Sequence, residues 1–310
     1  MKPKICITGG AGYIGSVLTN LLLKKNYDVT ILDSLNFGGD HIVQFISNKN
    51  FSFKKGDIRD EKFLKANIKA SDIIIHLAAI VGYPACSQNP SLAKEINVGC
   101  TKKLLKLSSK NQIIFYASTG SNYGSIDGIC SELTPLNPLT VYAKTKTQAE
   151  KLVTDHKNFL AYRFATAFGV SPRMRLDLLI NDFVYKMISQ NYLIVYEKHF
   201  MRTFIHIQDI ARSFLFGIEN YEKIKNEIYN VGNEKFNYSK EDICNIIKKY
   251  VPGFIHYAGI GEDMDKRNYV VSYEKIKKKG FNLKYDIEDG INELTKCIPL
   301  LNTKPKYFNA

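Results

Sequence analysis

Short apolar runs alternate with segments of helical spacing through the first half of the chain. The runs are rich in β-branched residues, and the continuous one at 72–79 is typical of a strand buried on both faces of a parallel sheet. The helical segments repeat apolar residues every three or four positions. The pattern predicts strands at 4–8, 28–32, 51–53, 72–79, 113–117 and 160–164, and helices at 16–24, from about 61, at 92–109 and at 141–156. It therefore predicts an α/β fold with a doubly wound parallel sheet.

A glycine-rich turn separates the first strand from the first helix. Gly10, Gly12 and Gly15 fit the spacing G-x-G-x-x-G, in which glycines permit a tight turn and let the backbone approach a pyrophosphate. The start of the following helix then faces the phosphates, as in a Rossmann domain. The residues expected to hold the dinucleotide here are Gly9, Gly12, Tyr13 and Ile14.

An acidic residue, Asp33, ends the second strand. Its carboxylate can accept hydrogen bonds from both hydroxyls of an adenosine ribose, and it would repel a 2′-phosphate. NAD is therefore favoured over NADP as the cofactor. The alternative is that Asp33 only caps the next turn.

Later strands supply further candidate cofactor contacts. Asp57 and Ile58 could flank the adenine, and the small residues Ala78 and Ala79 would let the backbone approach the cofactor. We interpret His76, inside the fourth strand, as a core histidine.

Composition excludes several classes of protein. Of 310 residues, 45% are hydrophobic and 24% charged, as in ordinary globular proteins. The net charge of +13 comes from scattered lysines rather than from a basic run with interleaved aromatics, so we expect no nucleic-acid partner. The six cysteines show no CxxC pair, which predicts reduced thiols in a cytoplasmic protein and no structural metal. We also expect no signal peptide and no membrane segment.

Tyr142 and Lys146 lie four residues apart, on one face of the helix expected at 141–156. A neighbouring ammonium favours phenolate, so Lys146 is expected to lower the pKa of Tyr142 from its usual value of about 10. Such a phenolate can take a proton from a sugar hydroxyl while a hydride leaves the same carbon. The alternative is a surface helix that carries an unrelated Tyr and Lys.

Seven motifs occur in a fixed order between about residues 4 and 270. They are Thr8–Gly15, Asp57–Asp60, Leu77–Ala79, Asn97 with Val98, Tyr123 with Gly124, Tyr142 with Lys146, and Arg202–His206. With them the chain resembles the extended short-chain dehydrogenase/reductases of the NAD-dependent epimerase/dehydratase family, which modify nucleotide-linked sugars. The resemblance implies NAD, a nucleotide-sugar substrate, and Leu77 and Asn97 as further cofactor contacts. It also implies that Thr119, with Ser118 as the alternative, helps to bind and deprotonate the sugar hydroxyl.

The resemblance further implies where the substrate binds. A smaller α/β domain, expected at 169–202 and 234–302, would hold the nucleotide-sugar against a Rossmann domain of 1–168 that is completed by about 203–233. An Arg fork suits two phosphate oxygens, although a surface salt bridge is the competing interpretation for each Arg. The residues expected to contact the substrate are Tyr83, Thr119, Ser121, Asn122, Arg173, Asn181, Arg202 and Arg267.

The same resemblance narrows the reaction. Gly120 and Ser121 stand where the family's 4,6-dehydratases carry Asp-Glu and its decarboxylases a Glu, so neither reaction is expected. A 4-epimerase or 4-dehydrogenase remains, with a 4-keto reductase or a non-catalytic NAD-binding regulator as alternatives. Stretches at 172–179 and 261–267 are similar to a GDP-manno-heptose 4-dehydrogenase of the family, which favours a surface-glycan or capsule sugar. The nucleotide and the sugar stay open.

Two further expectations concern assembly and the end of the sequence. In the family, helices equivalent to 92–109 and 141–156 pair across a two-fold axis, which implies a homodimer. Alternatively, their apolar residues Leu104, Leu105, Leu152 and Val153 could pack inward. The segment 303–310 is expected to be loose.

Overall fold

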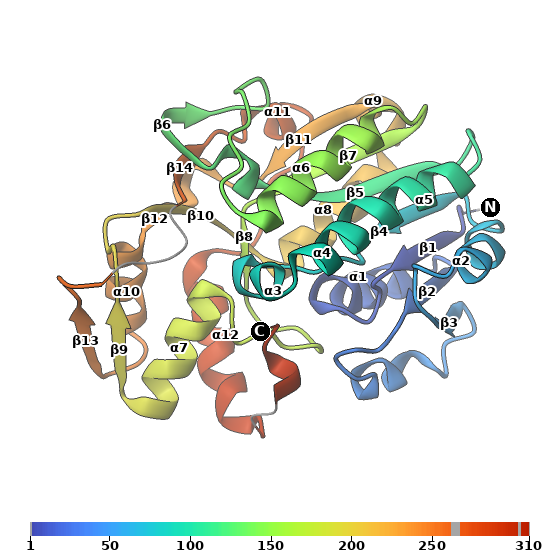
Figure 1. The fold of residues 1–310 in the computed structure, drawn as a ribbon. Coiled ribbons are helices and arrows are strands. Elements are labelled where there is room, and N and C mark those ends of the chain that lie inside the picture. Colours follow the sequence, from blue (N-terminus) through green and yellow to red (C-terminus); the bar gives the residue numbers. More distant parts are fainter. Residues whose placement is uncertain (1, 262–266, 303–304, 310) are drawn as a thin grey trace.

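The computed structural model describes residues 2–261, 267–302 and 305–309. A seven-stranded sheet forms the larger part of the molecule (Figure 1), in the order β11-β7-β5-β4-β1-β2-β3. All of its neighbouring strands are parallel. The strands are β1 (Ile5–Thr8), β2 (Val29–Asp33), β3 (Phe51–Lys55), β4 (Ile73–His76), β5 (Ile113–Thr119), β7 (Phe159–Phe164) and β11 (Glu227–Val231). The predicted α/β fold with a parallel sheet is confirmed.

Helices cover both faces of this sheet because side chains alternate along each strand. Ile5 and Ile7 join the core under α1 (Tyr13–Lys24) and α8 (Ile207–Glu219). Cys6, between them, joins the opposite core under α2 (Glu61–Ile68), α5 (Thr101–Leu107) and α6 (Val141–Thr154). Burial on both faces explains why the strands read as continuous apolar runs.

The helix predicted at 92–109 contains a wider turn. Helix α4 (Pro90–Lys94) continues into a π-helical segment, η2 (Glu95–Cys100), and then into α5. Such turns are uncommon and often mark functional positions. Asn97 lies within this one.

A second core lies beside the sheet. It is formed by α7 (Leu179–Gln190), α10 (Lys240–Lys248), α12 (Ile287–Cys297) and the strand pair β9 (Tyr192–Val195) with β13 (Phe254–Tyr257). This second core is a cluster separate from the two that cover the faces of the sheet, while the domain boundaries stay a prediction. The remaining strands are β6 (Ser125–Cys130), β8 (Thr166–Phe168), β10 (Met201–His206), β12 (Asn237–Ser239) and β14 (Asn268–Val271), and the remaining helices are α3 (Tyr83–Gln88), α9 (Tyr221–Ile224) and α11 (Glu274–Lys278).

The segment 305–309 is docked, so the expectation that 303–310 is loose is wrong for its described residues. The N–H of Leu176 donates to the Tyr307 carbonyl at 2.8 Å. The ring of Phe308 packs edge-on against that of Tyr185, with centroids 6.0 Å apart. Apolar packing thus offsets the entropy of ordering this segment.

Among the described residues, no helix is both long and apolar enough to cross a membrane.

Candidate active site

A cavity of about 360 Å³ opens at the carboxyl edge of the sheet. Its walls come from the turn after β1, the ends of β2 and β5, the loop after β4, and the start of α6. Doubly wound folds bind their ligands at this edge. Most of the residues that the sequence assigns to a site line the cavity: Gly9, Gly12, Tyr13, Ile14, Asp33, Asp57, Ile58, Leu77, Ala78, Ala79, Tyr83, Thr119, Ser121, Tyr142, Lys146, Arg173 and Arg267.

The glycine turn brings β1, α1 and the loop after β4 together. Gly9 has a φ of +71°, and a Cβ there would lie 2.6 Å from the Ala78 nitrogen. A Cβ on Gly15 would meet the backbone of Gly10 at 2.6 Å. Only glycine permits both approaches. The start of α1, at Gly12, therefore lies at the cavity wall, where its first N–H groups favour phosphate.

Asp33 ends β2 at the cavity wall. Its Oδ2 accepts from the Ala11 N–H at 3.0 Å, and its Oδ1 accepts from the Leu35 N–H at 2.8 Å. The carboxylate therefore caps the next turn and also lines the cavity. Burial raises its pKa, and the two backbone bonds act in the opposite direction.

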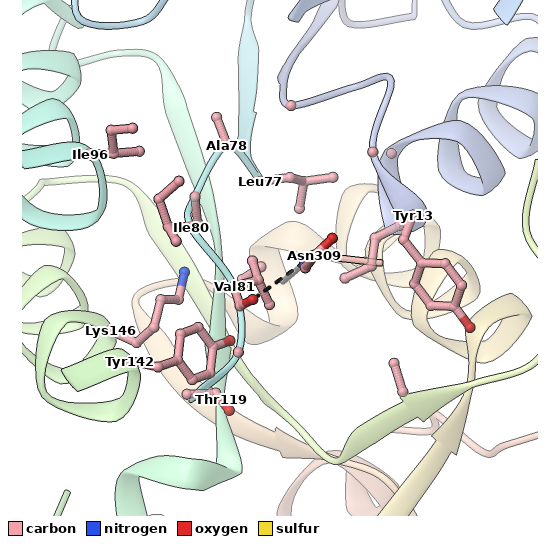
Figure 2. Close-up of a pocket in the computed structure, with 18 of the residues that line it drawn as sticks. Tyr13, Leu77, Ala78, Ile80, Val81, Ile96, Thr119, Tyr142, Lys146 and Asn309 are labelled. Atoms are coloured by element: carbon pink, nitrogen blue, oxygen red, sulfur yellow. Dashed lines mark hydrogen bonds between the residues drawn. The ribbon is translucent and has the colours of Figure 1, made fainter. Parts of the chain in front are cut away.

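Thr119, Tyr142 and Lys146 form a group on one side of the cavity (Figure 2). Thr119 ends β5, whereas Tyr142 and Lys146 lie one turn apart on α6. The N-terminus of α6 is set by Thr140, whose side chain accepts from the Ala143 N–H at 3.1 Å. Thr119 Oγ1 donates to Ser121 Oγ at 3.0 Å, and Thr119 and Tyr142 both line this side of the cavity. A hydroxyl group entering the cavity can therefore meet the threonine and the phenol together.

The pKa of Tyr142 does not follow the expectation from the sequence. Burial raises it to about 12, and the nearby Thr119 hydroxyl together with the charges of Arg175 and Arg267 only partly opposes this. Burial also lowers the pKa of Lys146 to about 7. The expected lowering of the Tyr142 pKa by Lys146 is therefore wrong for the protein alone, because desolvation outweighs neighbouring charge at both positions.

A buried ion pair lies beneath this group. Arg163 Nη2 donates to Glu150 Oε1 at 2.7 Å, and Ser118 Oγ donates to Glu150 Oε2 at 2.6 Å. The charge of Glu150 raises the pKa of Lys146, which partly offsets desolvation. Ser118 is thus tied to Glu150, while Thr119 is the hydroxyl that acts to lower the Tyr142 pKa.

Asn97 does not line the cavity but holds one of its walls. Its Oδ1 accepts from the Ile80 N–H at 2.8 Å, and its Nδ2 donates to the Ile80 carbonyl at 3.0 Å. Nδ2 also donates to Thr145 Oγ1 at 3.0 Å, on α6. Asn97 thus positions the loop after β4, and the direct cofactor contact expected of it stays a prediction.

Three expected substrate contacts also lie outside the cavity lining. Asn122 donates to Ser118 Oγ at 3.2 Å. Asn181 accepts from the Gly169 N–H at 3.0 Å and donates to the Arg175 carbonyl at 2.8 Å. Arg202, 1% exposed, donates to the carbonyls of Met201 and Arg267. Asn181 and Arg202 are thus paired within the protein, as buried polar groups usually are, whereas Asn122 Oδ1 has no hydrogen-bond partner among the described residues.

Several lining residues were not predicted from the sequence, among them Arg175 and Asn309. Arg175 forms two bonds with Asp177, of 3.0 and 2.5 Å, and it stands two positions after Arg173, which was the available signal. Asn309 belongs to the segment expected to be loose, so no local pattern pointed to it.

The residues present fit NAD. The cradle that a Cβ would fill at Gly9, the carboxylate of Asp33 and the buried ammonium of Lys146 occupy one continuous cavity. Asp33 would hold the adenosine ribose, and Lys146 the nicotinamide ribose. Bound NAD would supply a hydride acceptor and, in its oxidised form, a positive charge. Among the described residues, no three His, Cys, Asp or Glu side chains are grouped to hold a metal ion.

The fold and this site define an NAD-dependent enzyme that acts on nucleotide-linked sugars. The family model "NAD dependent epimerase/dehydratase family" matches residues 5–232, and the chain belongs to that family. A putative UDP-glucose 4-epimerase of Methanocaldococcus jannaschii is 30% identical over 305 residues, covering 94% of this chain and 96% of that protein. The low-salt glycan biosynthesis protein Agl12 of Haloferax volcanii is 28% identical, covering 93% of this chain and 96% of its own length. The structure of a Bacillus cereus UDP-glucuronic acid 4-epimerase, with UDP-glucuronic acid and NAD, has a TM-score of 0.83 at 24% identity, covering 96% of this chain and 99% of that one; it supports the fold.

Proposed function

We propose that this enzyme oxidises C4 of a nucleotide-linked sugar, as a 4-epimerase or a 4-dehydrogenase. The observation that carries the proposal is that Thr119 and Tyr142 line the same side of the cavity, with Lys146 one helical turn from Tyr142. A sugar hydroxyl at this place has both an acceptor for its proton and a second hydroxyl to orient it.

In the proposed step the sugar loses the proton of its C4 hydroxyl to the Tyr142 phenolate and a hydride from C4, which leaves a ketone. Thr119 orients the reacting oxygen. A phenol with a pKa of about 12 is mostly protonated at neutral pH and cannot then accept a proton. The cationic groups near Tyr142 must therefore lower its pKa further once ligands are bound. Arg175 and Arg267 already lower the Tyr142 pKa. Lys146, kept partly protonated by Glu150, would add to their effect.

The fate of the ketone separates the two activities. An epimerase lets the ketone turn and returns the hydride to its other face, whereas a dehydrogenase releases the ketone. Tyr83 and Ser121 line the cavity, and we expect them to determine how much space the ketone has to turn. Relatives named as UDP-sugar 4-epimerases support epimerisation, and the relative named for glycan biosynthesis supports a surface-glycan sugar.

Tyr142→Phe is the direct test of this assignment. We expect turnover to fall by about 10³-fold, because the base is lost, while folding and NAD binding are kept. Turnover should be followed with UDP-, GDP-, CDP- and dTDP-sugars, including GDP-manno-heptose, by absorbance at about 340 nm for NADH and by NMR for product stereochemistry. A C4-inverted product without net NADH identifies an epimerase, and NADH that discharges only on a keto acceptor identifies a dehydrogenase. Near-wild-type turnover by Tyr142→Phe would refute the role of Tyr142.

A further inference from the structure

The segment 305–309 supplies one residue of the cavity wall, Asn309, although it lies far in sequence from the glycine turn. The short helix η6 (Pro305–Tyr307) is held by the Leu176 to Tyr307 backbone bond and by the packing of Phe308 on Tyr185. Lys306 adds an ion pair with Asp40, with 2.6 Å between Nζ and Oδ2. The segment is thus anchored both to the second core and to the loop after β2.

Asn309 connects two walls of the cavity. Its Oδ1 accepts from Arg173 Nη2 at 2.7 Å, and its Nδ2 donates to the Val81 carbonyl at 3.3 Å. Figure 2 shows Asn309 between Val81, in the loop after β4, and Tyr13, at the start of α1. The side chain therefore connects Arg173 to the loop after β4.

Arg173 is buried with one N–H group unpaired, although the charges of Asp177 and Asp33 act on its guanidinium. The side chain is 3% exposed, its guanidinium lies 4.0 Å from the centroid of the Phe37 ring, and its buried Nε has no hydrogen-bond partner. Burial and the nearby charge of Arg175 lower its pKa to about 10. A buried guanidinium that faces a cavity with an unmet N–H is suited to bind a phosphate.

The position of this group identifies whose phosphate it meets. Phe37, against which Arg173 packs, follows Asp33, the residue that would hold the adenosine ribose. Val81 follows Ala78 and Ala79, on the way to Lys146. A dinucleotide that extends from Asp33 past the glycine turn toward Lys146 passes under the Arg173–Asn309–Val81 bridge. The diphosphate of a nucleotide-sugar would instead lie farther toward Arg267.

We propose that the segment Pro305–Asn309 is a wall of the NAD cleft and that Asn309 is a positioning residue, which holds the Arg173 guanidinium against the phosphates of the cofactor. Arg173, which the sequence assigned to the substrate, thereby becomes a cofactor contact. The proposal depends on NAD binding and not on chemistry at C4. It has a kinetic consequence: NAD must leave past an ordered wall, so its exchange is slow.

Asn309→Ala and Asn309→Asp test the proposal, with Asn302→Ala as the control because Asn302 is exposed in the same part of the chain. We expect Asn309→Ala to weaken NAD binding by about tenfold, since it leaves Arg173 and Val81 unpaired. Asn309→Asp should weaken it further, because a carboxylate cannot donate to Val81 and repels phosphate. A merely structural role predicts the opposite order, since Asp would pair better with Arg173.

The measurements are NAD affinity by titration and exchange of bound NAD against isotopically labelled NAD. UDP and GDP are titrated in parallel as probes of the substrate diphosphate. In both Asn309 variants we expect bound NAD to exchange faster than in Asn302→Ala. We expect their affinities for UDP and GDP to stay within about twofold of that control. If UDP or GDP binding weakens while NAD binding does not, Arg173 and Asn309 serve the substrate, and the proposal is wrong. If the wild-type protein binds neither UDP nor GDP, the proposed function is in doubt, yet the NAD measurements still decide this proposal.

A double-mutant cycle with Arg173→Met completes the test. If Asn309 acts through Arg173, its substitution should have little further effect on NAD affinity once the guanidinium is gone. Additive losses would show that Asn309 does not position Arg173. If both Asn309 variants bind and exchange NAD just as Asn302→Ala does, the proposal is wrong.

Discussion

Lys146 is buried in the cavity wall, with its ammonium 4.1 Å from the centroid of the Tyr116 ring. Burial disfavours its charge more than the ring and Glu150 favour it, so its pKa falls to about 7. The proposed activity thus depends on a residue whose charged form destabilises the cofactor-free protein. Catalytic groups are often held in this way.

Lys146→Met should therefore stabilise the cofactor-free protein at acidic pH. The unfolded chain holds the Lys146 proton up to about 10.5 and the folded chain only up to about 7, so the wild-type stability contribution of Lys146 rises between these values. Each pKa unit corresponds to about 1.4 kcal/mol, so the gain at pH 6 should be on the order of a few kcal/mol and shrink toward pH 9. Urea unfolding at both pH values measures it.

Lys144→Met is the matched control, because Lys144 is exposed on the same helix. It should change the free energy of unfolding by less than about 0.5 kcal/mol at either pH. A Lys146→Met gain that does not shrink with rising pH would contradict the assigned cause.

At the scale of elements, the turn between β1 and α1 determines the geometry of the cofactor site. Gly9 adopts a left-handed conformation against Ala78 of the loop after β4, and Asn97 fixes that same loop to α6. Two elements far apart in sequence are therefore held at backbone contact distance, which rigidly defines the cavity.

Gly9→Ala should disturb this contact. The new Cβ would lie 2.6 Å from the Ala78 nitrogen in a conformation unfavourable for alanine, so we expect a loss of about 2–4 kcal/mol in unfolding free energy and weaker NAD binding. Gly99→Ala is the control, because a Cβ there meets nothing within 4 Å. Calorimetry and NAD titration of both variants measure the effect. Equal behaviour of the two variants would show that the close approach at Gly9 is not needed.

For the whole molecule, the homodimer stays a prediction. Leu104 and Val153 are fully buried against the sheet, whereas Leu105 and Leu152 are half-buried on α5 and α6. The inward alternative therefore holds for the first pair and in part for Leu105, which packs against the same core; the exposed parts of Leu105 and Leu152 remain to contribute to an isologous interface.

Light scattering should give twice the chain mass of 35.3 kDa at micromolar concentration. Replacing Leu105 and Leu152 together by Glu should shift the protein toward monomer, because unpaired carboxylates would be buried in the interface. A monomeric wild-type protein would refute the prediction.

Much of the fold and part of the site could be predicted from the sequence. The strand, turn and helix order at residues 4–24, the acidic end of β2, and the pairing of Tyr142 with Lys146 depend on backbone periods of two and 3.6 residues. These are local properties, so a pattern of residue types reports them directly. Tertiary packing changed only where each element begins and ends, and it added the π turn at Asn97.

Only the tertiary structure decided which polar side chains face the cavity and how they titrate. Asn181 and Arg202 carry the chemistry of ligand contacts, yet their polar groups are paired with backbone inside the protein. Asn309 reaches the cavity because apolar packing of Phe308 docks its segment. Tyr142 has a raised rather than a lowered pKa, because desolvation depends on everything packed around it. Contacts between residues far apart in sequence decide which side chains face the cavity and how deeply each is buried. Residue spacing alone does not encode these contacts.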